Sequence, residues 1–226
     1  MLHPVFKRLR VDPGLDFFRH RTAERLRKMF SPRWVASKLA ATAHSLRNPD
    51  DPWLVRDAVA ALDEWLEPHH KVLEWGSGVS TPWLAERAGS VTSIEHDPEW
   101  HRKALVALGQ KSLKNAEVRL AVEADYVRQA DSFPDGAFDL ILNDGLLRGR
   151  ALSASLSKLK PGGLLVCNHV NYFLPSDSAT PHSRSRADGP EESVDPDAFV
   201  ELQRWKVKWM SDGVIDTAFF WKPEHH

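Results

Sequence analysis

A short apolar run early in the chain ends in an acidic residue and a glycine-rich turn. Val72-Leu73 precedes Glu74, and a Gly-x-Gly pair follows at Gly76 and Gly78, before a segment with helical periodicity. Strand, tight glycine turn and helix open a nucleotide-binding α/β unit, in which glycines let the backbone approach a ligand closely. A dinucleotide fingerprint has a third glycine where this chain has Thr81. We therefore expect a ligand without a pyrophosphate, and the acid suits a cationic or amine-bearing one.

A second acid ends the next predicted strand. Residues 91–95 are predicted to form a strand that ends in Glu95, 19 residues after Gly76, where an acid that accepts from ribose hydroxyls is expected. Later predicted strands, at 118–122, 138–142 and 164–167, are also followed by polar side chains. Ligands in open α/β sheets bind beyond the carboxyl ends of the strands, so these side chains are expected to meet in one site.

In this order, the pieces resemble the class I S-adenosylmethionine (SAM)-dependent methyltransferases. The matching pieces are Glu74-x-Gly76-x-Gly78-x-Ser80, Glu95-His96-Asp97, Ala124-Asp125, Phe138-Asp139-x-Ile141-x-x-Asp144-Gly145 and Leu159-Lys160-Pro161-Gly162-Gly163. The resemblance covers roughly residues 51–223. A nicotinamide-binding domain is the alternative, because it shares the glycine loop.

The resemblance implies SAM as the cofactor and assigns it a set of residues. Glu74 and the loop after it would hold the methionine part, Glu95 the ribose, and Asp125 with Tyr126 the adenine. The candidate cofactor-binding residues are Glu74, Gly76, Ser77, Gly78, Ser80, Thr81, Glu95, His96, Asp125, Tyr126 and Asn143.

The ends of the fourth and fifth predicted strands decide the subclass. The cation-dependent catechol-type O-methyltransferases, which the chain partly resembles, bind a divalent cation with a strand-four Asp and a strand-five Asp-Asn pair. Here Asp144 is present, but the pair falls on Asn168-His169. Hard cations prefer carboxylate oxygen, so no metal is expected.

His169 and Asp144 become the catalytic candidates, with His169 either a general base or a structural or substrate-contacting residue. Arg148 is either an exposed residue at a helix start or a partner for an acidic acceptor.

The acceptor is inferred by elimination. The Asp/Asn-Pro-Pro-aromatic turn of amino-directed DNA enzymes is absent, since Asn143-Asp144-Gly145-Leu146 stands there, and the paired-glutamate loop of arginine enzymes is not evident. A hydroxyl of a small molecule or saccharide is expected, with no nucleic-acid partner. N-methylation on the same scaffold is one alternative. A non-catalytic SAM-binding or membrane-associated accessory protein is another.

Composition suits one α/β domain with additions. The chain has 226 residues, 42% of them hydrophobic, a net charge of −1, nine tryptophans and one cysteine. The single cysteine excludes an internal disulfide and suits a reducing cytoplasm. No apolar run is long enough to span a membrane, and the start lacks a signal-peptide core. Most of the tryptophans are expected to pack in the core rather than to line a substrate cleft.

Alternating strand and helix patterns predict a Rossmann-like, seven-stranded, mostly parallel sheet that ends in an antiparallel hairpin at 205–221. Residues 1–50 are expected to form a helical extension, broken at Ser31-Pro32, that precedes the methyltransferase domain at 51–226. Its basic amphipathic pattern suits packing over the core, or peripheral membrane contact through residues 1–46. The polar segment at about 175–196 is expected to be a mobile lid.

Overall fold

The molecule is built on one mixed sheet. The structure is a computed structural model, and it describes residues 28–224. Seven strands lie in the order β3-β2-β1-β4-β5-β7-β6, and β7 alone runs in the direction opposite to the other six. The strands are β1 (Lys71–Trp75), β2 (Ser90–Glu95), β3 (Ala116–Leu120), β4 (Phe138–Asn143), β5 (Leu159–Asn168), β6 (Lys206–Ser211) and β7 (Asp216–Trp221). The predicted Rossmann-like sheet with a closing hairpin is therefore confirmed.

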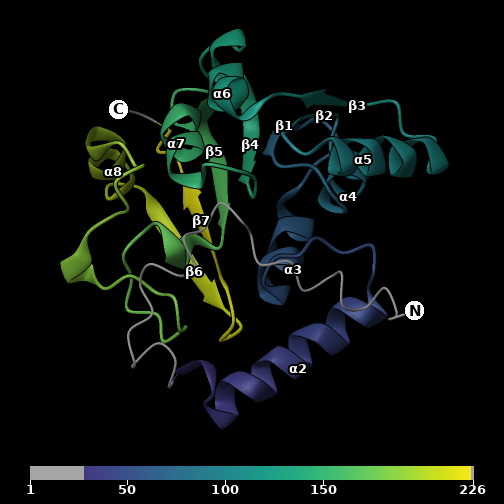
Figure 1. Ribbon diagram of the computed structural model, residues 1–226. Helices are drawn as coiled ribbons and strands as arrows, with labels where there is room; N and C mark the ends of the chain where they lie inside the picture. Colours follow the sequence, from purple (N-terminus) through teal and green to yellow (C-terminus); the bar gives the residue numbers. More distant parts are fainter. Residues whose placement is uncertain (1–27, 225–226) are drawn as a thin grey trace.

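Helices cover both faces of this sheet (Figure 1). One face packs against α3 (Arg56–Trp65), α4 (Ser80–Ala85) and α5 (Pro98–Gln110). The other packs against α6 (Glu123–Tyr126), the 3-10 helix η2 (Val127–Ser132), α7 (Arg148–Ser155) and α8 (Pro196–Leu202). The remaining helices are α2 (Pro32–Arg47) and the 3-10 helices η3 (Val170–Tyr172) and η4 (Arg186–Asp188).

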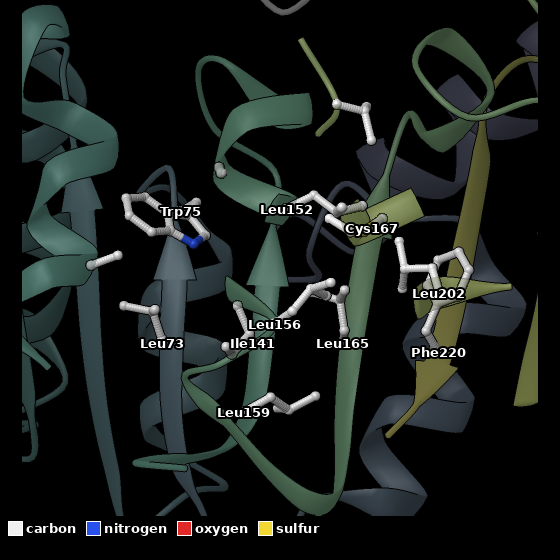
Figure 2. Close-up of a cluster of buried hydrophobic side chains, with 14 of the residues drawn as sticks. Leu73, Trp75, Ile141, Leu152, Leu156, Leu159, Leu165, Cys167, Leu202 and Phe220 are labelled. Atoms are coloured by element: carbon white, nitrogen blue, oxygen red, sulfur yellow. The ribbon is translucent and has the colours of Figure 1, made fainter. Parts of the chain in front are cut away.

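Buried side chains alternate between the two faces along each central strand. In β5, Leu165 and Cys167 join the core under α7, whereas Leu164 and Val166 join the core under α3 and α4. The first of these cores also holds Trp75, whose indole nitrogen donates to the Ser155 hydroxyl at 2.9 Å (Figure 2). Continuous apolar runs are typical of strands buried on both faces, and this is why the strands could be read from the sequence.

Two predicted boundaries are wrong. The fifth strand starts before the predicted residue 164, because α7 ends at Ser155 and Leu159 pairs with Phe138 as the first residue of β5. The Pro-Gly-Gly turn is an irregularity inside that strand, where Gly162 has a φ of +76°. The third strand is Ala116–Leu120 rather than 118–122, because Val122 already serves as the cap residue of α6.

The segment before the core is helical where the structure describes it. The break at Ser31-Pro32 is confirmed, since the Ser31 hydroxyl accepts from Trp34 N at 3.2 Å and starts α2. The helix expected at about 17–30 lies almost entirely outside the described residues. No residue of α2 is buried. None of the helices within residues 28–224 is both long enough and apolar enough to cross a membrane.

The polar segment expected to be a lid has its own internal structure. Arg184 N donates to the Asn171 carbonyl at 3.1 Å, and the Arg184 guanidinium donates to the Gly189 carbonyl at 3.0 Å. Thr180 and Val194 are buried. The segment is held largely by hydrogen bonds between polar groups, which leave little apolar pattern in the sequence. Its internal structure was therefore not predicted. Its closure over an acceptor stays a prediction.

The loops after β1 and β4 touch through two glycines, at the point where the strand order reverses. Gly76 has a φ of +90°, and a Cβ added there would lie 2.6 Å from the Gly145 Cα. A Cβ at Gly145 would in turn collide with the Tyr126 hydroxyl and the Gly76 backbone. Ligands of open α/β sheets bind at such a switch point, so this contact fixes the floor of the expected site.

We expect Gly76→Ala to destabilise the fold by about 2–4 kcal/mol, because it combines a left-handed φ with a backbone clash. Gly109→Ala is the matched control: nothing lies within 4 Å of its added Cβ, in helix α5, so stability should stay equal or rise by up to about 1 kcal/mol. Urea unfolding midpoints measure both. Equal midpoints for the two variants would contradict the proposed close approach.

Candidate functional site

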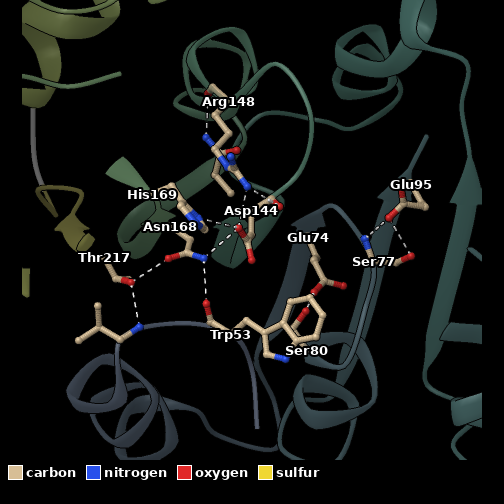
Figure 3. Close-up of polar contacts among 12 residues, drawn as sticks. Trp53, Glu74, Ser77, Ser80, Glu95, Asp144, Arg148, Asn168, His169 and Thr217 are labelled. Atoms are coloured by element: carbon tan, nitrogen blue, oxygen red, sulfur yellow. Dashed lines mark hydrogen bonds and ion pairs between the residues drawn. The ribbon is translucent and has the colours of Figure 1, made fainter. Parts of the chain in front are cut away.

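The predicted acids and polar residues gather at the carboxyl ends of β1, β2, β4 and β5 (Figure 3). Two groups can be separated by their contacts. One comprises Glu74, Glu95 and the loop between β1 and α4. The other comprises Asp144, Asn168, His169 and Arg148. The first group is the expected cofactor side, and the second is the expected acceptor side.

Glu74 is buried and holds the start of helix α4. Its two carboxylate oxygens accept from the Ser80 hydroxyl at 2.5 Å and from the Thr81 hydroxyl at 2.6 Å. Burial raises the pKa of Glu74 to about 7, against the opposing effect of these hydrogen bonds. A carboxyl poised near neutrality becomes a strong attractor for a cation that enters the site.

The predicted loop residues divide into a supporting group and an accessible group. Thr81 is fully buried, and its hydroxyl accepts from Gly78 N at 3.2 Å while it donates to Glu74. Ser77 and Gly78 are only partly buried. At Gly78 an added Cβ would meet nothing closer than the Trp100 ring, at 3.9 Å. Thr81 therefore shapes the loop, while Ser77 and Gly78 form its open part.

Glu95 is tied to the same loop from the end of β2. One oxygen accepts from Ser77 N at 2.6 Å and from the Ser77 hydroxyl at 3.0 Å. The other accepts from His96 N at 2.7 Å and from Asp97 N at 2.8 Å. Burial acts to raise the pKa of Glu95, but the hydrogen bonds from His96, Asp97 and Ser77 outweigh it and hold the pKa low. The group is an ionised acceptor, as a ribose-binding acid must be.

The expected adenine side is formed by β2 and β3. His96 lies beside Tyr126, with ring centroids 5.9 Å apart, and its Nδ1 is 3.0 Å from a Glu95 oxygen. Tyr126 is fully buried and packs on Trp75, with ring centroids 5.3 Å apart. It therefore supports the site from within the core. Asp125 is exposed and lies 3.6 Å from Arg128.

Sequence reasoning passed over two exposed residues on that side. Ala121 N donates to the Glu95 carbonyl at 2.7 Å, which places the end of β3 next to the end of β2. Val122, 66% exposed, and Glu123 follow at once. They follow directly on the residue that is bonded to Glu95, and the signal in the sequence was the strand end itself rather than the Ala-Asp pair.

Asp144 is the centre of the acceptor side. Its Oδ1 accepts from the Arg148 guanidinium at 3.0 Å and from the Asn168 amide at 3.0 Å. Burial acts to raise the pKa of Asp144, but His169, Arg148 and Asn168 together hold it below its ordinary value. Arg148, expected to be exposed or to bind an acidic acceptor, has a side chain only 10% exposed and is bonded to Asp144 instead.

His169 follows β5 and faces Asp144. Its Nδ1 lies 3.8 Å from Asp144 Oδ1, and its ring stacks on Tyr172 with centroids 5.5 Å apart. Its φ of +51° is uncommon for a residue other than glycine, and such conformations cluster at functional sites. The side chain is 27% exposed, which leaves Nε2 as the nitrogen that a substrate can reach. The arrangement suits a base whose other ring nitrogen is oriented by a carboxylate.

Asn143 is placed differently from its expected neighbours. It is fully buried, and its amide donates to the Arg148 carbonyl at 2.8 Å. This contact ties the end of β4 to the first residue of α7. A cofactor-binding role for Asn143 thus stays a prediction, while its role in the loop is visible.

The donor set at Asp144 does not fit a divalent cation. The Asn168 amide turns its nitrogen toward Asp144, because its oxygen accepts from the Thr217 hydroxyl at 3.0 Å. The Arg148 guanidinium, a cation itself, occupies the same carboxylate oxygen. Within residues 28–224, no group of three or more His, Cys, Asp and Glu side chains could hold a metal ion.

A pair of tryptophans borders both halves of the site. Trp53 is 40% exposed, and its ring meets Trp100 edge-to-face at 5.6 Å. Its carbonyl accepts from the Asn168 amide at 3.1 Å. Most tryptophans are expected in the core, and no motif in the sequence singles out this one.

Comparisons with known proteins agree with this geometry. Residues 73–170 match the model of a family described as a methyltransferase domain. A comparison with curated proteins gives no match.

Several solved structures share the fold at low identity. A candidate caffeoyl-CoA O-methyltransferase from Staphylococcus aureus covers 87% of this chain and 95% of its own, with a TM-score of 0.53 and 16% identity. A methyltransferase from Geobacter sulfurreducens covers 85% and 89%, with a TM-score of 0.50 and 16% identity. A candidate methyltransferase from Streptococcus mutans, in complex with SAH, covers 75% and 99%, with a TM-score of 0.50 and 14% identity.

Residues 73–170, which match the methyltransferase domain, also hold the glycine contact at the switch point of the sheet. The chain has the fold of the class I SAM-dependent methyltransferases, and SAM is the cofactor of that class.

Glu74 gives the site a testable pH dependence. Without cofactor its pKa is about 7, so it holds a proton below that pH. The ammonium group of SAM favours the ionised form, so binding must expel the proton at lower pH. We expect SAM affinity to fall about tenfold per pH unit below pH 7 and to level off above it.

Calorimetry between pH 6 and 8, in buffers of different ionisation enthalpy, measures both the affinity and the released proton. Glu74→Gln should bind weakly with little pH dependence. Glu67→Gln, at a surface position 62% exposed, is the control and should behave as the parent. A parent affinity that is flat across this range would show that Glu74 does not sense the cofactor.

Proposed function

We propose that the chain transfers the methyl group of SAM to a hydroxyl of a small molecule or saccharide, with His169 as the general base. The observation that carries the proposal is the pairing of His169 with Asp144 beside the glycine loop. The imidazole is partly exposed, and its buried nitrogen faces a carboxylate whose pKa is held low. Asp144 stays ionised at neutral pH, so it orients the imidazole and stabilises its protonated form.

The cofactor is proposed to lie along the line from Glu74 to Glu95. Glu74 and the open part of the loop, Ser77 and Gly78, would take the methionine part. Glu95 would accept from the ribose hydroxyls in exchange for the Ser77 hydroxyl. His96 and the exposed Val122 would border the adenine. Both acids fit a ligand that carries an ammonium group and a diol.

Bound SAM supplies an electrophilic methyl group on a positively charged sulfur. The chain's own residues must then align the acceptor oxygen with it and remove the hydroxyl proton. Nε2 of His169 would take that proton as the oxygen attacks. The Asp144 carboxylate would stabilise the resulting imidazolium, and Arg148 and Asn168 would keep that carboxylate in place.

N-methylation is the nearest alternative on this scaffold. A neutral amine can attack without a base, whereas an aliphatic hydroxyl benefits from one. A base positioned by a carboxylate therefore favours a hydroxyl acceptor. The Staphylococcus aureus structure that shares the fold is a candidate O-methyltransferase, which accords with this choice.

A non-catalytic, membrane-associated accessory protein is the alternative from another class. The observation in its favour is helix α2, which leaves Val35, Leu39 and Leu46 at least 43% exposed, next to Phe30 at 77%. Sedimentation with vesicles that contain anionic lipid tests this alternative. Binding to vesicles without any turnover of SAM, across all acceptors tried, would favour it over catalysis.

We expect His169→Ala to bind SAM as tightly as the parent and to lose about 10²–10⁴-fold in turnover. Release of demethylated cofactor, measured with a panel of phenols, catechols and sugars, is the assay. His69→Ala is the matched control, because that side chain is 71% exposed and lies before β1. A chelator should leave parent activity unchanged. Full turnover in His169→Ala would remove the base from the mechanism.

Asp144→Asn should lose turnover as well, but it also leaves the Arg148 guanidinium without its carboxylate. We therefore expect a loss of stability of about 1–3 kcal/mol in that variant, measured by thermal unfolding. The comparison separates the two roles. A variant that unfolds at the parent temperature and turns over normally would contradict both.

A further inference from the structure

We propose that the face of Trp53 recognises the sulfonium charge, so that the site prefers SAM over its neutral demethylated product. This inference rests on the proposed placement of the cofactor and goes beyond it, because Trp53 belongs to none of the family's matched motifs. It lies in the segment between α2 and α3.

The position of Trp53 is fixed from two sides. Its carbonyl accepts from the Asn168 amide, which also donates to Asp144, so the backbone of Trp53 is held next to the acceptor side. Its ring contacts Trp100, whose own ring is the nearest group to the open face of Gly78. Trp53 therefore bridges the end of β4 and the loop assigned to the methionine part.

Figure 3 shows the first of these contacts, from the Asn168 amide to the Trp53 carbonyl and to the Asp144 carboxylate. In SAM, the sulfonium joins the methionine part to the transferred methyl group, and that methyl group must face the acceptor. A ring that links the acceptor side to the loop at Gly78 then borders the sulfonium rather than the adenine or the ribose.

The chemistry of the ring fits a diffuse cation. The face of an indole attracts a cation held within about 6 Å, more strongly when water is excluded. Neither carboxylate is left for the sulfonium, because Glu74 is assigned to the ammonium group and Asp144 is bonded to Arg148 and Asn168. Trp53 is 40% exposed even though its carbonyl is hydrogen-bonded, as expected for a surface that awaits a ligand.

The consequence is a distinction between substrate and product. After transfer the sulfur carries no charge, so its attraction to the ring is lost while the ammonium and ribose contacts remain. Removal of the ring should therefore weaken SAM more than the demethylated product. A ring that served only as an apolar wall would lose the same factor for both.

The test compares dissociation constants of SAM and of the demethylated product for the parent, Trp53→Phe and Trp53→Leu by calorimetry. Trp53→Leu should weaken SAM by about tenfold and the product by less than about threefold. Trp53→Phe should give an intermediate ratio, because phenylalanine is the weaker cation receptor. The Trp65→Leu variant is the matched control, since Trp65 stacks on His70 at the opposite end of β1, and it should leave the ratio unchanged.

The remaining outcomes overturn the inference or separate it from the proposed function. Equal weakening of both ligands, or of neither, in Trp53→Leu and Trp53→Phe overturns it. Thermal unfolding of each variant shows whether the protein remains folded, and Trp53→Phe preserves a ring of similar shape. His169→Ala should keep the parent ratio. A failure of the base assignment would therefore leave this result standing, and a failure of Trp53 would leave the base assignment untouched.

Discussion

The buried amide of Asn168 is the interaction on which the site depends. Its nitrogen donates to the Asp144 carboxylate and the Trp53 carbonyl, and its oxygen accepts from the Thr217 hydroxyl. That hydroxyl in turn accepts from Val55 N at 3.2 Å. One side chain thus joins the ends of β4 and β5, the start of β7 and the segment before α3. Because its hydrogen bonds are all to protein, a shift in any of these elements would leave a buried polar group unpaired, at a cost of about 1–3 kcal/mol.

The site holds two carboxyl groups, the buried Glu74 and the half-buried Asp144, and their surroundings give them opposite properties. Glu74 accepts only from neutral hydroxyls among its hydrogen-bonding side chains, so burial dominates and raises its pKa to about 7. Asp144 faces Arg148 and His169, so its pKa is held low despite burial. Pairs of titratable groups whose pKa values are driven apart are typical of sites that divide their chemistry between two residues. In the proposed function, this division would be between a carboxyl that responds to a cationic ligand and a carboxylate that orients a base.

The parts that the sequence could predict are those in which a local pattern carries the information. The apolar runs of β1, β2 and β4, the glycine turn at Gly76 and the polar strand ends were all read from residue types and spacing. These signals arise because parallel strands are buried on both faces and because only glycine fits the contact at the switch point. The fold class and the grouping of Glu74, Glu95 and Asp144 followed from them.

The parts that escaped prediction depend on contacts between distant segments. Arg148 carries the same local signal whether it is exposed at a helix start or bonded to Asp144, and only the fold brings it to the carboxylate. The structure of the 175–196 segment is held by hydrogen bonds such as the one from Arg184 to the Asn171 carbonyl, which leave no apolar period. Trp53 precedes a helix without a motif, and its place is set by Asn168, more than a hundred residues later in the chain.

This division explains why the cofactor could be anticipated and the acceptor could not. The cofactor side is built by strand ends and a glycine loop, whose geometry the sheet itself enforces. The acceptor side is built by a side chain at an unusual backbone conformation, His169, by Tyr172 stacked on it, and by His182, 5.1 Å from Tyr172, in the polar segment. These groups come from loops that the sheet does not constrain, so substitutions there can change the acceptor without cost to the core. His169 is the residue at which the two sides meet, because it lies 3.8 Å from Asp144 at the sheet while Tyr172 packs against it from the loop.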